Sequence, residues 1–380
     1  MGYHGRFEKP HKKRGGKIAL IIVLVLLVLV LGVAAILWLY IDSKLDKLDI
    51  VEVPKVVYTE EATEPTAVPQ TTTVTEAATT EATTTETTEP PHVASSEDYI
   101  NILLVGQASR AGEDERFADT MILCTINKYE KTLRLTSFLR DAFAKMPDYK
   151  GHVGGRIKLT TIYHLGSHYS NGDPAGSMEL MNMALYNNFG VEVDHNIEID
   201  FDGVIKAIDL MGGVGIELTQ EEADYLNDPS LDGWKPYKVE PGYFWLDGAG
   251  ALCYARMRKA AGDADSDITR TSRQRNLINA LLERIRSMSI SDLNKLADEV
   301  LPTITTSMSK QDITDMLKLM ISILPDLKME AGGTCPVEGT YTGDPPVDIY
   351  GDGVYHSVLH FHADQQKRLM RAITEGEIAE

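Results

Sequence analysis

An uncharged apolar run near the N-terminus constrains this chain more than any other feature. The run begins at Ile18 and ends at Ile41, and a helix of this length crosses the ~30 Å hydrocarbon core of a bilayer. Six basic residues and one acidic residue precede it, so the positive-inside rule keeps residues 1–17 in the cytoplasm. A cleaved signal peptide is the alternative, but its apolar core is only ~7–15 residues and no A-x-A site follows this run. The sequence predicts a single-pass anchor in the cell membrane, with the rest of the chain extracellular.

A segment rich in threonine and glutamate follows the run. Between Thr59 and Ser96 there are 14 Thr and seven Glu, with no Lys or Arg. Such a composition cannot bury enough apolar area to offset the entropy lost on ordering, and its like charges extend it. We therefore predict that residues 42–96 are an extracellular linker that acts as a spacer. It holds residues 97–380, predicted to be one extracellular domain, well off the membrane.

The charge of the outer domain limits its partners. Of the total net charge of −19, residues 97–380 carry −16, from 28 basic and 44 acidic side chains. This balance argues against nucleic acid as a partner, because the phosphate backbone attracts basic surfaces. An anion site in this domain must therefore be built by local clustering of arginine. Three cysteines exclude a disulfide-rich scaffold, although Cys253 and Cys335 allow one extracellular disulfide.

Strands and helices are mixed along the outer domain. Apolar runs bounded by turn residues predict strands, and apolar residues at helical spacing predict helices. The expected strands are residues 99–105, 120–126, 133–139 and 195–200, and the expected helices are 176–188, 201–210, 246–256 and 272–286. Thr219 and Glu222 form a capping-box pattern that opens one more short helix. This mixture predicts an α/β domain with a central mixed sheet flanked by helices, ending in a strand-rich or irregular tail from about Gly332.

Two polar clusters lie where predicted strands end. Residues 110–119 form a polar loop after the first strand, and loops that leave strand ends commonly carry ligand sites. Residues 137–141 end the third strand with an Arg-Asp pair. Taken alone, the first cluster is equally consistent with a solvated loop, and the second with a structural ion pair.

Two further clusters are rich in arginine. Arg256 and Arg258 share a face if the preceding helix ends there. A second helix that begins nearby places spaced side chains along one side, at Asp267, Arg270, Arg273 and Gln274. Residues 256–275 hold five Arg and one Lys, and arginine pairs bidentately with phosphate oxygens. A solvated charged helix is the alternative interpretation, but it does not explain the choice of arginine, which favours a pyrophosphate site.

The order and spacing of these clusters resemble the LytR-CpsA-Psr family, from about Ile100 to Leu282. The matching segments are G-Q-A-S-R (106–110), R-F-A-D-T (116–120), S-F-L-R-D (137–141), K-L-T-T-I-Y (158–163), F-D-G (201–203), M-G-G-V (211–214), Y-A-R-M-R (254–258) and D-I-T-R-T-S-R-Q (267–274). Two positions depart from the family pattern. Leu139 stands where proline is usual, and Ala108 stands where the family often has a second metal-binding carboxylate.

The resemblance implies an activity and a set of site residues. Members of the family move an anionic glycopolymer, such as a teichoic acid or capsular polysaccharide, from a polyprenyl-pyrophosphate carrier onto peptidoglycan. By this resemblance the pyrophosphate is held by Arg110, Arg116, Arg140, Arg256, Arg258, Arg270, Arg273 and Gln274. Asp119 is expected to bind Mg²⁺, although Ala108 removes the usual second carboxylate. The lipid tail is expected in an apolar pocket between sheet and helices.

The chemistry expected is phosphoryl transfer to a sugar hydroxyl, which depends on alignment and charge stabilisation. Arg140 is expected to stabilise the developing charge, and either Asp141 or Asp267 to accept the hydroxyl proton. Two alternatives remain open. A pyrophosphatase would use the same arginines with water as the acceptor, and a wall-polymer binding or regulatory protein would use them without turnover.

Overall fold

The structure is a computed structural model and describes seven parts of the chain, residues 45–56, 96–107, 116–228, 237–257, 266–323, 326–330 and 332–374. The predicted cytoplasmic tail and the apolar run lie outside these parts, as does most of the segment rich in Thr and Glu. Among the helices that are described, none is long and apolar enough to cross a bilayer. The anchor predicted for the apolar run therefore stays a prediction.

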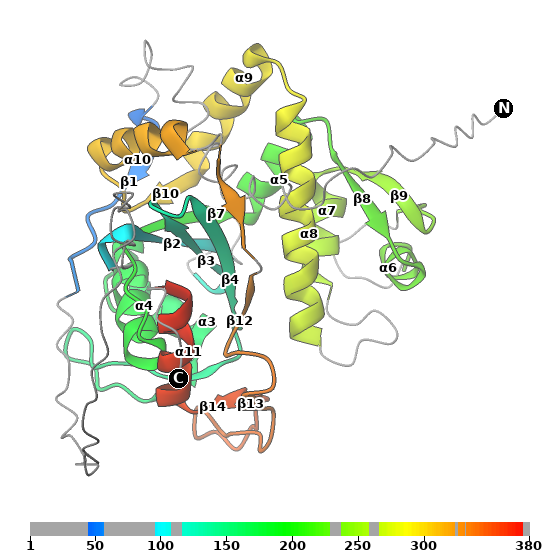
Figure 1. Cartoon of the computed structure of the whole chain (residues 1–380). Coiled ribbons are helices and arrows are strands. Elements are labelled where there is room, and N and C mark those ends of the chain that lie inside the picture. Colours follow the sequence, from blue (N-terminus) through cyan, green and yellow to red (C-terminus); the bar gives the residue numbers. More distant parts are fainter. Residues whose placement is uncertain are drawn as a thin grey trace, which may run out of the picture.

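One mixed sheet forms the centre of the domain (Figure 1). Its strands are β1 (Asp49–Ile50), β2 (Tyr99–Gln107), β3 (Ala118–Asn127), β4 (Thr132–Phe138), β7 (His195–Asp200), β10 (Ile304–Thr306), β11 (Lys328–Met329) and β12 (Gly333–Cys335). Their order is β1-β10-β7-β2-β3-β4-β11, with β12 also paired to β4. β3 pairs antiparallel with both β2 and β4, whereas β7 joins β2 in parallel. The four strands expected from the sequence are β2, β3, β4 and β7, and all four are confirmed.

Helices cover both faces of this sheet (Figure 1). One face packs against α3 (Leu159–His168), α4 (Pro174–Phe189) and α11 (Ala363–Thr374). The other face packs against α5 (Phe201–Leu210), α6 (Gln220–Leu226), α7 (Gly248–Arg256), α8 (Ser266–Arg286), α9 (Ile290–Val300) and α10 (Lys310–Ile323). Short elements complete the fold, namely η1 (Ser96–Asp98), η2 (Leu301–Thr303) and the ribbons β5 (Phe143–Lys145) with β6 (Arg156–Lys158), β8 (Val214–Leu218) with β9 (Gly242–Leu246), and β13 (Tyr341–Thr342) with β14 (His360–Phe361).

The two central strands β2 and β3 contribute side chains to two separate cores. Successive side chains of a strand point to opposite faces. Ile102 and Leu104 of β2 therefore join the core beneath α5, α7 and α8, whereas Leu103 and Val105 join the core beneath α3 and α4. Because both faces are buried, these strands appear in the sequence as continuous apolar runs.

Helix boundaries follow local capping. The side chain of Asp247 accepts a hydrogen bond from the backbone N–H of Gly250, so α7 begins at Gly248 rather than at Leu246 as expected. The capping box of Thr219 and Glu222 is present at the start of α6, as expected. The tail after Gly332 contains the expected short strands, and it also contains the unexpected helix α11.

The predicted linker needs a correction at its beginning. Residues 45–56, which we name the stem, belong to the folded domain because β1 pairs in parallel with β10. Leu45 and Leu48 are buried in the core shared with α9 and α10. The apolar spacing of these two leucines is typical of a buried segment, but the polar composition of the residues that follow favoured a linker.

Candidate active site

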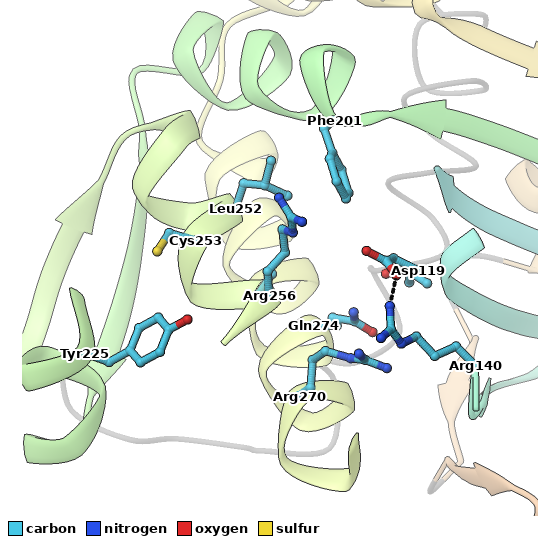
Figure 2. Close-up of a pocket in the computed structure, with 11 residues that line it drawn as sticks. Asp119, Arg140, Phe201, Tyr225, Leu252, Cys253, Arg256, Arg270 and Gln274 are labelled. Atoms are coloured by element: carbon cyan, nitrogen blue, oxygen red, sulfur yellow. Dashed lines mark hydrogen bonds and ion pairs between the residues drawn. The ribbon is translucent and has the colours of Figure 1, made fainter. Parts of the chain in front are cut away.

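A pocket of about 330 Å³ opens between the sheet and helices α7 and α8 (Figure 2). Its lining residues are Asp119, Thr120, Arg140, Phe201, Tyr225, Leu252, Cys253, Ala255, Arg256, Arg270 and Gln274. They come from strand β3, from the turn that follows β4, and from four helices of one face. Five of them are site residues predicted from the sequence, so segments up to 155 residues apart meet here as expected.

Asp119 and Arg140 form the sheet side of the pocket. Asp119 lies at the start of β3 and Arg140 follows the end of β4. Because these strands are antiparallel neighbours, both residues lie at the same end of the sheet. An Nη1–H of Arg140 donates to Oδ1 of Asp119, and each side chain is 16% exposed. The guanidinium is thus fixed in direction while part of it still faces the pocket.

A second carboxylate, that of Asp141, also contacts Arg140. Asp141 has its Oδ2 atom 3.6 Å from Nε of Arg140, and its Oδ1 atom accepts a hydrogen bond of 2.8 Å from Nζ of Lys158. Asp141 is not one of the residues that line the pocket. With one cation at each oxygen, this carboxylate is placed to orient Arg140.

Two arginines approach the pocket from the helices. Arg256 is the last residue of α7, is exposed, and lies 4.5 Å from the centroid of the Phe201 ring in a cation–π contact. Arg270 lies on α8 and is only 4% exposed, so its charge is largely removed from water. Figure 2 shows Arg140 and Arg270 pointing toward one another across the pocket. The lining therefore combines three guanidiniums with one carboxylate, a local excess of positive charge in an acidic domain.

Two predicted pyrophosphate ligands lie elsewhere, each bound to a buried glutamate. Arg273 donates from Nε to Glu222 at 2.8 Å and from Nη1 to the carbonyl of Met257 at 3.2 Å. Arg116 donates from Nη1 to Glu198 at 2.5 Å. Neither arginine is among the lining residues. Arg270 and Gln274 line the pocket, whereas Arg273 is turned toward Glu222 of α6 and the carbonyl of Met257.

The structure leaves three predicted site residues unplaced. Arg110 and Arg258 lie outside the described residues, as does Ala108. Asp267 lies in the first turn of α8, and only its backbone position is described. Their roles therefore stay predictions.

An almost wholly apolar pocket of about 120 Å³ adjoins the first one. It is lined by Leu104, Val105, Gly106, Thr120, Ile122, Ile197, Ile199, Phe201, Val204, Leu252, Ala255, Gln274, Leu277, Ile278 and Leu281. The two pockets share five of these residues, Thr120, Phe201, Leu252, Ala255 and Gln274. A polar cavity bearing arginines thus continues into an apolar cavity between the sheet and α8.

The cysteines carry no bond in this structure. Cys124, Cys253 and Cys335 are all buried and free. The disulfide that the sequence allowed between Cys253 and Cys335 is absent, because the two side chains belong to cores on opposite faces of the sheet. Cys253 lines the same pocket as Arg140, but burial raises its pKa to about 11, which keeps the thiol protonated at neutral pH.

The lining provides few oxygen ligands for a metal. Asp119 contributes a carboxylate and Thr120 a hydroxyl. Among the residues that are described, no group of three His, Cys, Asp or Glu side chains is arranged to hold a metal ion. Proteins usually bind Mg²⁺ through one or two carboxylates together with substrate phosphates and water. These residues therefore fit Mg²⁺ only in company with a phosphate ligand.

Sequence reasoning assigned no site role to several lining residues. Phe201 was noted within the F-D-G segment, and its position at the junction of β7 and α5 was the signal that places it at the edge of the sheet. Tyr225 gave no signal. It reaches the pocket on α6, the helix whose first turn carries Glu222, the partner of Arg273.

The fold and the pocket define the class of protein. The sequence pattern of the LytR_cpsA_psr family matches residues 65–339, and the chain belongs to this family.

The chain is also similar to several named proteins. The chain is 28% identical over 226 residues to Biofilm regulatory protein A of Streptococcus mutans, covering 57% of this chain and 51% of that protein. It is 27% identical over 209 residues to the polyisoprenyl-teichoic acid–peptidoglycan teichoic acid transferase TagV of Bacillus subtilis, covering 54% and 49%. It thus spans about half the length of these curated relatives. The solved structure of TagT bound to LI-WTA shares the fold, with a TM-score of 0.52, 21% identity, and 74% of this chain and 92% of that chain covered.

Proposed function

We propose that this protein transfers an anionic glycopolymer from a polyprenyl-pyrophosphate carrier to a hydroxyl group of peptidoglycan. TagV, a relative, is named as a transferase of teichoic acid from a polyisoprenyl carrier to peptidoglycan. TagT, which shares the fold, was solved with LI-WTA bound. Both names agree with the activity expected from the order of motifs in the sequence.

The continuity of the two pockets carries the proposal. A polyprenyl pyrophosphate has a charged head joined to a hydrocarbon tail. The guanidiniums of Arg140, Arg256 and Arg270 suit the diphosphate head, because arginine forms paired hydrogen bonds with phosphate oxygens. The apolar cavity beside them suits the first part of the tail, and residues such as Phe201 and Leu252 line both cavities. A soluble phosphate ester would have no use for the second cavity.

The proposed reaction is a displacement at phosphorus. The acceptor oxygen attacks the phosphorus on the polymer side, the bond to the bridging oxygen breaks, and lipid phosphate leaves. Arg140, Arg256 and Arg270 stabilise the charge that develops on the phosphate oxygens. Asp141 or Asp267 accepts the proton of the acceptor hydroxyl. The two cations bound to Asp141 favour an orienting role for it, which leaves Asp267 as the stronger choice of base.

A metal ion and a membrane anchor are parts of the same proposal. Asp119 is the residue that would hold Mg²⁺, together with the diphosphate of the substrate, and the ion would neutralise phosphate charge. The apolar run from Ile18 to Ile41 would anchor the chain in the cell membrane, with residues 1–17 in the cytoplasm and the catalytic domain outside. This location would place the catalytic domain beside a carrier lipid that resides in the same membrane.

A transfer assay with matched variants tests the proposal. Labelled lipid-linked polymer is incubated with the full-length protein, with and without peptidoglycan fragments. We expect Arg256→Ala to lower transfer by roughly 10²-fold or more, because one charge-stabilising donor is lost. Arg256 is exposed, so the fold should persist, and Arg371→Ala, an exposed arginine on α11, is the control with unchanged rate.

The acceptor decides between the alternatives. Label that joins peptidoglycan supports the transferase. Lipid phosphate released equally well without peptidoglycan would identify a pyrophosphatase, and binding without any release would identify a regulatory or binding protein. A wild-type rate in the Arg256→Ala variant would contradict the assignment of this pocket.

A further inference from the structure

The stem, residues 45–56, lies between the apolar run and the segment rich in Thr and Glu, yet it is part of the sheet. Asp49 is opposite Thr305 in the parallel pairing of β1 with β10, and the N–H of Val51 donates to the carbonyl of Thr306 at 2.9 Å. Leu45 and Leu48 are 5% and 7% exposed. The chain therefore enters the folded domain before the polar segment begins, not after it.

Side chains attach the stem to two helices. Nζ of Lys47 lies 2.9 Å from Oδ1 of Asp298 on α9, and Lys310 at the start of α10 donates to Asp46. Exposed ion pairs of this kind contribute little to stability. Burial of the two leucine side chains contributes more, because both are removed almost completely from water. The ion pairs fix the position of the stem, and the leucines hold it there.

The stem fixes how far the domain can lie from a bilayer. Only residues 42–44 separate the end of the predicted span from Leu45, and three residues extend to ~10 Å at most. The segment at 57–95 leaves the domain after the stem and rejoins it at η1, which leads directly into β2. Because both of its ends are attached to the same domain, its length does not add distance from the membrane.

The attachment also sets the orientation of the pockets. Along α8, Arg270 comes first, Gln274 lines both cavities, and the apolar lining residues Leu277, Ile278 and Leu281 follow toward α9. Arg270 and Leu281 are separated by about 16 Å along the helix axis. Figure 1 shows that this end of α8, α9, α10 and β1 all lie on one side of the molecule. The apolar cavity is thus nearer the side where the stem enters, and the arginines are farther from it.

We infer that the stem holds the domain directly on the outer surface of the bilayer, with the end formed by β1, α9 and α10 against the membrane. In this orientation the apolar cavity faces the lipid and the arginines of the pocket face the bacterial cell wall. This inference rests on the anchor and the lipid carrier of the proposed function. Drawing a prenyl tail out through water exposes apolar surface, and the cost grows with each carbon exposed. A domain in contact with the bilayer avoids most of that cost, whereas a domain on a spacer does not.

Cutting the polar segment tests the inference. A site for a sequence-specific protease is placed at residues 75–81 of the full-length protein in membranes, and the membranes are sedimented after cleavage. We expect most of the cut domain to stay in the pellet, because the stem still holds it, and to be released by urea. Release without denaturant would overturn the inference.

Two controls isolate the stem as the cause. The same protease site at residues 42–44 should release the domain, because the cut separates the stem from the anchor. Leu45→Asp combined with Leu48→Asp should release the domain after a cut at 75–81. Sedimentation requires no catalysis, so its result is independent of the transfer assay with Arg256→Ala.

Discussion

Two groups of arginines, expected from the sequence to act together, serve different parts of the molecule. Arg140, Arg256 and Arg270 line the pocket, where Asp119 is the lone carboxylate of the lining. Arg116 and Arg273, which we name the wall arginines, each pair with a buried glutamate instead. Arg140 also pairs with a carboxylate, but its partner Asp119 is 16% exposed and itself lines the pocket. The difference teaches that burial of the paired carboxylate, rather than the arginine motif, separates an arginine that faces the pocket from one that holds the fold.

The partners of the wall arginines come from distant parts of the sequence. Glu198 is 82 residues from Arg116, and Glu222 is 51 residues from Arg273. A buried charge is tolerated only when it is paired and hydrogen-bonded. Each arginine therefore compensates the buried charge of its glutamate, and the glutamate compensates the charge of the arginine. A phosphate ligand would have to displace a protein carboxylate that has no other cation among the contacts described above.

Removing a wall arginine should have the largest effect, and on stability. Arg273 and Glu222 are 6% and 7% exposed, so Arg273→Ala leaves a buried glutamate without its cation. We expect the free energy of unfolding to fall by about 3–5 kcal/mol, as for other broken buried pairs. Urea denaturation measures the loss, and the transfer rate per folded molecule should stay near the wild-type rate.

A double variant separates the two roles of Arg273. Combining Arg273→Met with Glu222→Gln removes both charges, so it should destabilise less than Arg273→Ala alone. If Arg273→Ala instead keeps full stability and abolishes transfer, then Arg273 binds substrate and the comparison between the two groups fails.

Much of the fold could be predicted from the sequence, because its signals are local. Buried strands such as β2 and β3 appear as apolar runs, and α5 follows from its apolar spacing. The stem could not be predicted, because β1 contributes only two paired residues and its pairing with β10 joins Asp49 to Thr305 across the whole domain. Pairings of this kind depend on the tertiary fold, which the local pattern does not contain.

The site was predictable in its residue types and only partly in its membership. Arginine in motif order indicated a diphosphate site, and Arg140, Arg256 and Arg270 do line one pocket. The motif spacing did not separate Arg270 from Arg273, because the direction of each side chain depends on what packs beside α8. The second cavity was expected only from the family resemblance, and its lining comes from strands and helices whose packing the sequence does not specify.

A smaller effect is expected when a pocket arginine keeps its charge and loses its shape. Arg270→Lys retains the cation but cannot form paired hydrogen bonds with a phosphate. We expect about a tenfold loss in kcat/KM for the lipid-linked substrate, the value of one hydrogen bond to a charged group at ~1.5 kcal/mol. Kinetics with the full-length protein in membranes measure it, and Lys367→Arg on α11 is the control. A loss of stability larger than the loss of transfer would place Arg270 with the wall arginines.

The smallest effect concerns the other wall pair and its dependence on pH. Burial raises the pKa of Glu198 above its ordinary value of 4.5, even though Arg116 and Tyr163 lower it. The folded protein therefore holds this proton more tightly than the unfolded chain does. It follows that the stabilising contribution is complete below pH 4.5 and is lost as the pH rises through the raised value, by at most ~1.4 kcal/mol per pH unit. Glu198→Gln cannot titrate, so urea unfolding from pH 4.5 to 7 should show the wild type losing stability relative to the variant. If the two pH profiles run parallel, Glu198 is already ionised throughout this range. The ion pair with Arg116 then lowers the pKa of Glu198 by more than burial raises it.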